Sequence, residues 1–161
     1  MQLAECIGYQ PKWIIRKYAD DDAYANDRPF DVSEIDGNLL LNEGITRLLN
    51  LLIAGGGTAF DNANARIGIG DDATAEDAAQ TDLLAAANKL YKGMEATYPS
   101  IAGQTVTFRA VFIGTEANYA WNEFTVDNGA AAGENLNRKV SAQGTKAAGQ
   151  TWTVDLNIQL S

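Results

Sequence analysis

The stretch Thr151-Trp152-Thr153-Val154-Asp155-Leu156-Asn157-Ile158-Gln159-Leu160 decides the class of fold. Apolar and polar residues alternate through it without a break. Successive side chains of a strand point to opposite faces of a sheet, so this pattern predicts a strand with one buried and one solvated face. The buried face is expected to hold Trp152, Val154, Leu156, Ile158 and Leu160.

Further strands are expected upstream of this one. The segment Gln104 to Phe112 alternates in the same way, and shorter runs rich in β-branched and aromatic residues occur at 13–18, 65–70, 89–94, 117–126 and 136–140. The alternation slips between Trp121 and Phe124, which indicates a bulge or a strand covered on both faces. No strand-helix-strand alternation is present. We therefore predict a mainly β protein, an antiparallel β-sandwich or jelly-roll-like domain.

One amphipathic helix is predicted over residues 38–54. Apolar residues recur there at helical spacing, Asp36 or Asn38 is placed to cap the start, and Gly55-Gly56-Gly57 ends it. Further leucines make this helix apolar over much of its circumference. We expect it to be covered on more than one side, either by its own sheet or by a neighbouring subunit.

Two regions are predicted: an extended arm over residues 1–36 and a β-sandwich domain over residues 37–161. The segment 19–37 is polar, acidic and without period, which is long for a connection inside a compact domain. Aromatic and arginine residues contribute strongly to protein interfaces, so the arm supplies candidate interface residues. These are Trp13, Ile14, Ile15, Tyr18, Tyr24, Arg28 and Phe30. The alternative is that its aromatic residues pack back on their own domain.

The net charge of −9 comes from 21 acidic and 12 basic residues and is concentrated in residues 20–36 and 71–82. With no basic stripe the chain lacks the electrostatic footprint of a nucleic-acid-binding protein. The longest apolar stretch is far shorter than the roughly 20 residues of a membrane span, and no signal peptide is recognisable. The acidic stretch 71–82 is predicted to be a solvated loop, with a bound cation as the alternative.

The chain contains no histidine and a single cysteine, Cys6. Histidine-based catalysis, an internal disulfide and a structural zinc site are thereby excluded. Glu123 and Asp127 would share a strand face at about 13 Å, too far apart for a glycosidase pair, and Glu116 would face the other way. The sequence Ile67-Gly68-Ile69-Gly70-Asp71-Asp72 lacks the third glycine and the Lys-Ser/Thr of phosphate-binding loops. We predict no enzyme activity, no cofactor and no metal.

The run from Gly37 to Leu160 resembles virion structural proteins of tailed bacteriophages. Five segments in order carry the resemblance: 38–45, 67–71 with Thr74, Thr81 and Leu83 downstream, 106–110, 116–123 and 135–139. The resemblance implies a β-rich protein built into the particle, with no catalytic residues. Related patterns occur in head-decorating proteins and in tail-fibre or tail-adaptor parts.

Size favours the first of these locations, because the chain has no coiled-coil heptads, no Gly-X-Y shaft and no long repeats. We expect a capsid decoration, or cement, protein on the exterior of the virion. Its expected partners are the major capsid protein and further copies of itself, with a trimer favoured, and neither nucleic acid nor membrane. The alternatives are a tail, collar or tail-fibre-associated adaptor, then a host-glycan-binding module or a carboxylate-based hydrolase.

Overall fold

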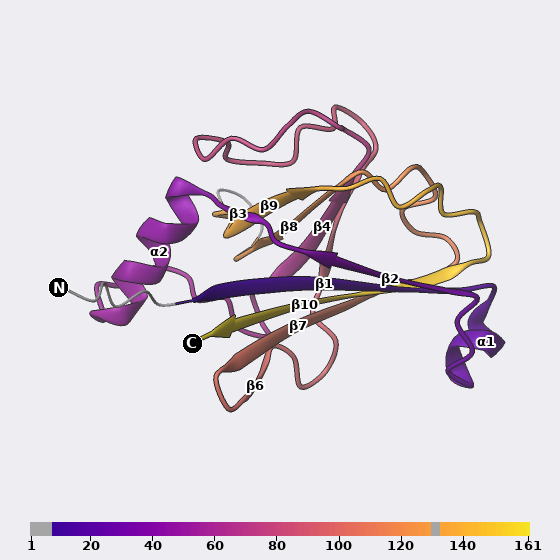
Figure 1. Cartoon of the computed structure of the whole chain (residues 1–161), viewed down its shortest axis with the longest axis horizontal. Coiled ribbons are helices and arrows are strands. Elements are labelled where there is room, and N and C mark those ends of the chain that lie inside the picture. The colour runs from indigo at the N-terminus through magenta and orange to yellow at the C-terminus, as the bar shows by residue number, and fades with distance from the viewer. Residues whose placement is uncertain (1–7, 130–132) are drawn as a thin grey trace, which may run out of the picture.

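The computed structural model describes residues 8–129 and 133–161, and these form an antiparallel β-sandwich (Figure 1). Its first half contains β1 (Tyr9–Tyr18), α1 (Asp21–Ala25), β2 (Asp31–Asp36), β3 (Leu39–Leu40), α2 (Asn42–Leu52) and β4 (Arg66–Gly70). Its second half contains β5 (Lys89–Gly93), β6 (Ser100–Ala102), β7 (Thr105–Phe112), β8 (Glu123–Asp127), β9 (Asn137–Val140) and β10 (Thr151–Leu160). The two helices lie at opposite ends of the long axis.

The strands form two five-stranded sheets. The order is β2-β1-β10-β7-β6 in the first sheet and β3-β9-β8-β4-β5 in the second. The two longest strands, β1 and β10, pair antiparallel over their whole length, from Tyr9 opposite Leu160 to Tyr18 opposite Thr151. The stretch with the clearest alternation is therefore a central strand of the first sheet, between β1 and β7.

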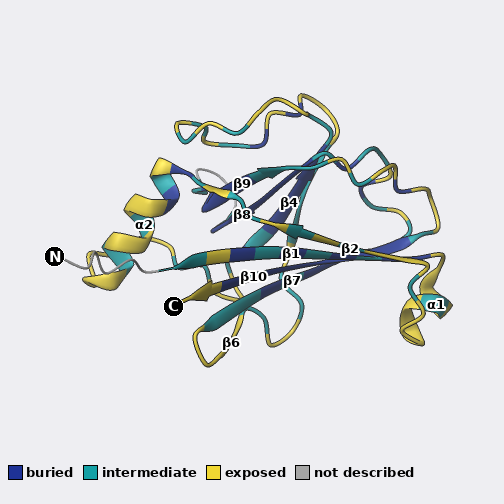
Figure 2. Ribbon diagram, viewed as in Figure 1, coloured by how far each residue is buried: buried dark blue, intermediate teal, exposed yellow. Residues whose placement is uncertain are grey.

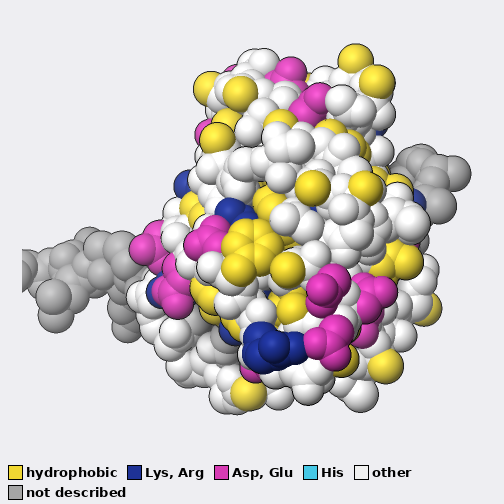
Figure 3. Space-filling view, turned by 90° about the vertical axis from the view of Figure 1, so that its right-hand side faces the viewer, with side chains coloured by type: hydrophobic (Ala, Val, Ile, Leu, Met, Phe, Trp, Pro, Cys, Tyr) yellow, Lys and Arg dark blue, Asp and Glu magenta, His cyan; other side chains and the backbone are white. Residues whose placement is uncertain are grey.

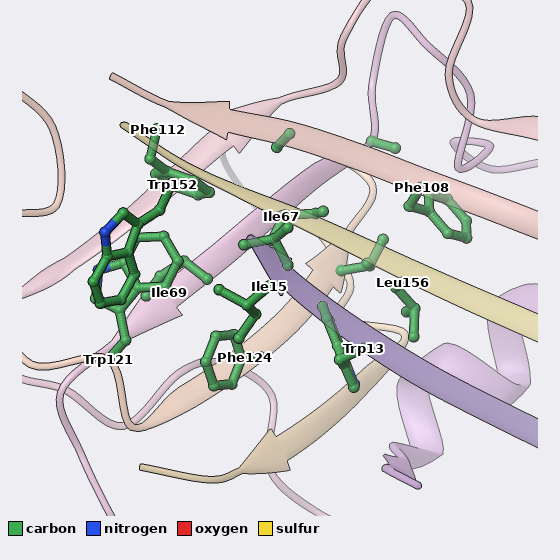
Figure 4. Close-up of a cluster of buried hydrophobic side chains, with 14 of the residues drawn as sticks. Trp13, Ile15, Ile67, Ile69, Phe108, Phe112, Trp121, Phe124, Trp152 and Leu156 are labelled. Carbon is green, nitrogen blue, oxygen red and sulfur yellow. The ribbon is translucent and has the colours of Figure 1, made fainter. Parts of the chain in front are cut away.

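The core lies between the two sheets and is rich in aromatic side chains (Figure 4). Trp13 of β1 contacts Phe124 of β8 across the sandwich, with ring centroids 5.7 Å apart. Trp121 packs edge-on against Trp152 and Phe112, at 4.8 and 5.0 Å. These contacts join opposite sheets, so the inner faces form one continuous core.

The prediction of an extended arm over residues 1–36 is wrong for Tyr9–Tyr18. This segment is β1, which is hydrogen-bonded on both sides, to β10 and to β2. Trp13 and Ile15 are fully buried in the core. The short length of the apolar run concealed this, because a six-residue strand and an extended arm have the same periodicity. Residues 1–7 of the predicted arm lie outside the described residues.

The predicted helix 38–54 is shorter in the structure. Leu39–Leu40 pair with β9 as β3, and α2 begins at Asn42 after Leu41, whose side chain is buried and forms no capping hydrogen bond. Neither Asp36 nor Asn38 caps the helix. The strands predicted within 65–70, 89–94, 104–112, 136–140 and 151–160 are confirmed, whereas that over 117–126 is confined to Glu123–Asp127. Trp121 precedes the strand, which explains the slip in alternation.

The acidic segment 19–37, predicted to belong mostly to the extended arm, contains two short regular elements. It holds α1, capped by the Asp20 carboxylate, which accepts from the Ala23 N–H at 2.8 Å, and the edge strand β2. Among the described residues, no helix has both the length and the apolar character required to cross a membrane.

Candidate interaction surface

Helix α2 turns its apolar face away from the sandwich. Ile45, Leu48, Leu49 and Leu52 follow the spacing of one helix face, and all four are exposed, Leu49 by 59% and Leu52 by 79%. Ile53, which follows the helix, is 75% exposed. Most of α2 is exposed or half-buried (Figure 2), and Gly44 is its one buried residue. This is the reverse of an ordinary surface helix, whose apolar face packs on the core.

Polar groups hold α2 in this orientation. Arg47 forms an ion pair with Glu134, with Nη2 donating to Oε1 at 2.9 Å, and its Nη1 donates to the Gly56 carbonyl at 2.9 Å. Glu43 accepts a hydrogen bond from the Asn135 N–H at 2.5 Å. Arg47 and Glu43 thus tie one side of the helix to the segment that leads into β9.

Gly44 allows the helix backbone to approach that segment closely. A Cβ at this position would lie within 2.6 Å of the Leu136 Cα and would also overlap its carbonyl oxygen. Only glycine fits here without displacing backbone. The side of α2 that carries Glu43, Gly44 and Arg47 is therefore fixed to the sandwich, and the leucine-rich side is left outward.

An apolar groove of about 660 Å³ lies next to this face. Leu48 and Leu51 of α2 form one wall, and the ends of the first sheet, with Ile101, Val106 and Leu160, form another. Ile101 is 79% exposed and Leu160, which the sequence predicted to face inward, is half-exposed. We call the exposed face of α2, its groove, Ile53, Ile101 and Leu160 the α2 surface.

Of the charges bordering the α2 surface, Arg47 and Glu134 neutralise each other, whereas the Glu43 carboxylate accepts from the Asn135 N–H. The Arg47 guanidinium holds the pKa of Glu134 below its usual range. Burial raises the pKa of Glu43, against the lowering effect of its hydrogen bond from Asn135. The outward stripe from Ile45 to Leu52 itself carries no charged side chain. Contiguous exposed apolar surface of this kind is a candidate interaction site.

The predicted interface residues divide into two groups. Trp13 and Ile15 are fully buried, Tyr18 is nearly so, and Ile14 is half-buried in the middle of the first sheet. These four are structural, so the alternative that they pack on their own domain is correct for them. Tyr24, Arg28 and Phe30 are exposed around α1 at the other end of the molecule.

The α1 end is acidic with an apolar centre (Figure 3). Tyr24 stacks edge-on against Tyr18 at 5.3 Å, and the Tyr18 hydroxyl donates to Asp27 at 2.9 Å. Phe30 is 56% exposed, and Arg28 pairs with Asp22 at 2.5 Å. Tyr18 thus anchors Tyr24 on the sheet, while Phe30 and Arg28 stay available at the surface.

The three carboxylates whose spacing argued against a glycosidase pair each form an ion pair with a different base. Glu123 pairs with Arg138, Asp127 with Arg66, and Glu116 with Lys92, at 2.7, 2.5 and 2.6 Å. Burial raises the pKa of Asp127 against the opposing effect of Arg66. These ion pairs account for the acids as structural groups, because each fixes a strand or a loop to its neighbour.

The acidic segment 71–82 is bound to the second sheet. Asp72 accepts from the Thr74 N–H at 2.7 Å, Glu76 from the Val140 N–H at 2.6 Å, and Asp82 from Lys89 at 2.5 Å. The described part of the chain holds no group of three or more acidic or cysteine side chains suited to a metal ion. The carboxylates here serve as acceptors within the fold.

The glycines of Ile67-Gly68-Ile69-Gly70 have a packing role. Both lie on the outer face of β4, where a Cβ on Gly68 would come within 2.6 Å of the Tyr91 ring and one on Gly70 would overlap the Glu123 carboxylate. They make room for side chains of the adjacent strands β5 and β8.

The sequence predicted the α2 surface only in part. The excess of apolar residues on α2 was recognised, but not the side on which it would be covered. The useful signal was Gly44 together with Glu43 and Arg47. Glycine lets the helix backbone approach its neighbour closely, and the two charged side chains find polar partners on that same side. Comparison of the chain with protein-family models, curated proteins and solved structures found no match.

Proposed function

We propose that the chain is a structural protein of a tailed-bacteriophage virion, of the capsid decoration type, which binds the outside of the major capsid lattice and stabilises the shell. The observation that carries the proposal is the outward apolar face of α2, held in place by the Arg47–Glu134 ion pair and by the close approach at Gly44. Contiguous exposed apolar surface is typical of sites that bind another protein, which suits a component of an assembly.

The remaining polar groups support a binding role. Glu116, Glu123 and Asp127 are engaged in separate ion pairs, and the sequence contains no histidine. A protein that binds only the assembled shell stabilises it by mass action, without chemistry. The resemblance of five sequence segments, in order, to virion proteins is what favours a phage particle as the assembly.

We propose that the contact with the shell is made by the α1 end. Phe30 and Tyr24 are exposed aromatic side chains on a rigid scaffold, and Arg28 lies beside them. Aromatic and arginine side chains contribute most to interface energy. Removing Phe30 together with Arg28 is expected to reduce binding to shells by about 30-fold or more, since a single strong anchor contributes that much.

The copy number in purified virions tests the proposal. A decoration protein is present in hundreds of copies, on the order of one per capsid symmetry position, and its removal lowers the temperature at which shells open. A stained gel calibrated against the major capsid protein gives the number. About six to twelve copies would instead assign the chain to the tail, collar or tail-fibre adaptor, and absence from virions would refute both.

A further inference from the structure

We propose that the α2 surface is covered by the α2 surface of a second copy of this chain, so that the protein self-associates about a symmetry axis beside this helix. The inference rests on the proposed role in an assembly and names the partner at that surface. It depends on three properties of the described residues: the area of the apolar surface, the distribution of charge and the geometry of the helix.

The exposed area is enough for a small stable interface. The exposed fractions of Ile45, Leu48, Leu49, Leu52, Ile53, Ile101 and Leu160 are together equivalent to about four fully exposed side chains. The transfer free energy of a leucine or isoleucine side chain, divided by the free energy per Å² of buried apolar surface, gives an area of roughly 60–120 Å² for each side chain. Each copy therefore offers about 250–500 Å² of apolar area. Two copies would bury up to about 1,000 Å² of apolar area. Interfaces of standard size, about 1,200–2,000 Å² in total and about 65% apolar in homodimers, need a similar amount.

Charge selects this end of the molecule for contact between like copies. Two chains of net charge −9 repel each other, and the repulsion is weakest where no unpaired charge is nearby. Five aspartates lie on or beside α1 at the far end: Asp20, Asp21, Asp22, Asp27 and Asp31. Asp22 pairs with Arg28 and Asp31 with Lys17, which leaves that end with a net negative charge. At the α2 surface, Glu134 is paired with Arg47, and Glu43 accepts from the Asn135 N–H on the side of α2 that is fixed to the sandwich. The uncharged apolar stripe of α2 has no charge to attract a strongly charged partner. The same stripe of a second copy is equally apolar, so the two can pack together without burying a charge.

The helix has the form that helix pairing requires. α2 has 11 residues, or about 16 Å at 1.5 Å per residue, and its apolar residues lie at positions i, i+3, i+4 and i+7. These rows interdigitate with those of a second helix at about 8–10 Å between axes. A symmetry axis repeats each contact in every copy, so the same small patch contributes to the interface from each copy.

Light scattering on the purified full-length chain tests the inference at about 1–100 µM protein. The expected mass is a whole multiple, at least twice, of the 17.3 kDa monomer. Leu49→Glu and Leu52→Glu place a charge in the contact and should weaken association by about 30-fold or more while leaving circular dichroism unchanged. Phe30→Glu, at an apolar residue of the α1 end that is 56% exposed, close to the 59% of Leu49, is the matched control and should leave the mass unchanged.

Cysteine cross-linking locates the contact independently. In a Cys6→Ser background, Leu52→Cys should give disulfide-linked dimers under mild oxidation, whereas Val32→Cys, 49% exposed on the edge strand β2, should not. A monomeric wild-type protein, or an oligomer unaffected by the two glutamate variants, would overturn the inference. Neither result concerns the copy number in virions, so the proposed function is tested separately.

Discussion

Glu123 and Arg138 form an ion pair in which neither side chain is exposed. Arg138 donates from Nε and Nη2 to the same carboxylate oxygen of Glu123, at 2.9 and 2.7 Å. The carboxylate also accepts from the Leu84 and Ala85 N–H groups, at 2.9 and 2.8 Å, and the remaining Arg138 nitrogen donates to the Thr74 carbonyl at 2.9 Å. This pair therefore holds both ends of the acidic segment against the outer face of the second sheet.

Loss of one partner of this pair should be costly. Arg138→Met leaves the Glu123 carboxylate buried without its cation, and we expect the free energy of unfolding to fall by about 3–5 kcal/mol. Adding Glu123→Leu should recover part of the loss. Lys12→Met, which breaks an exposed pair with Glu34, is the control and should leave stability nearly unchanged. Urea unfolding measures all of these. Equal effects of Arg138→Met and Lys12→Met would show that the buried pair is not structural.

Gly68 should not tolerate a methyl group. The Cβ of Gly68→Ala would lie 2.6 Å from the Tyr91 ring and 2.8 Å from the Thr125 methyl group, and overpacking of this kind costs about 1–3 kcal/mol. Gly93→Ala, on the adjacent strand, meets nothing within 4 Å and should be near neutral. Thermal unfolding of the two variants compares them directly. A neutral Gly68→Ala would mean that Tyr91 moves aside freely.

Strand β1 is expected to be indispensable for folding. Trp13→Ala removes a fully buried ring from the core and should cost about 3–5 kcal/mol. A chain lacking residues 1–18 loses the strand between β2 and β10 and should be unfolded by circular dichroism and amide exchange. A folded truncated protein would restore the arm that the sequence suggested. Ile14→Ala, at a half-buried residue of the outer face, should cost much less than Trp13→Ala.

Stability should fall in alkaline solution because several tyrosines resist ionisation in the folded state. Burial raises the pKa of Tyr9 and of Tyr18 to about 12, with Asp27 adding to the effect at Tyr18. An unfolded tyrosine ionises near pH 10, so above that pH the unfolded chain has lost protons that the folded chain keeps. The free energy of unfolding should decrease from about pH 10 toward 12, by up to about 1.4 kcal/mol per pH unit for each such residue.

Urea unfolding at several pH values, with tyrosinate absorbance followed in parallel, measures this slope. Tyr18→Phe should reduce it, since one raised pKa is removed. A stability that stays constant above pH 10 would contradict the expectation. Tyr24→Phe is a useful comparison, because Tyr24 is more exposed and its pKa is raised chiefly by partial burial.

Much of the fold could be predicted because alternation reports which side of a strand is buried. The core residues of β10 were identified correctly from alternation, apart from Leu160, which lies at the rim of the groove. The opposite face of β10 is not solvated as predicted, since Thr151, Thr153 and Asp155 are buried. Asp155 pairs there with Arg16 and Arg109. The strands β2, β3 and β6 were missed. β2 carries acids on both faces, and the other two contain three residues or fewer, so none has a periodic signal.

The candidate site was harder to predict than the fold. Its residues, Ile45 to Ile53 together with Ile101 and Leu160, come from three separate parts of the chain and meet only at one end of the sandwich. The sequence indicated an over-apolar helix, but its outward direction depends on Arg47 reaching Glu134, 87 residues away. Of the aromatic residues expected at an interface, Trp13 is buried because β1 pairs with β10 and β2, whereas Tyr24 and Phe30 stay exposed. No local pattern specifies which strands pair with β1.

The sequence by itself determined the β class, the position of the helix, the alternating core strands and the absence of histidine chemistry, because composition and periodicity are local properties. Only the tertiary structure decided that β1 lies between β2 and β10, that Glu123 pairs with Arg138, and that α2 is fixed by its polar side. The physical reason is the same in each case. Pairing between strands, buried charges and the facing of a helix depend on which distant residues come into contact, and those contacts form only in the folded chain.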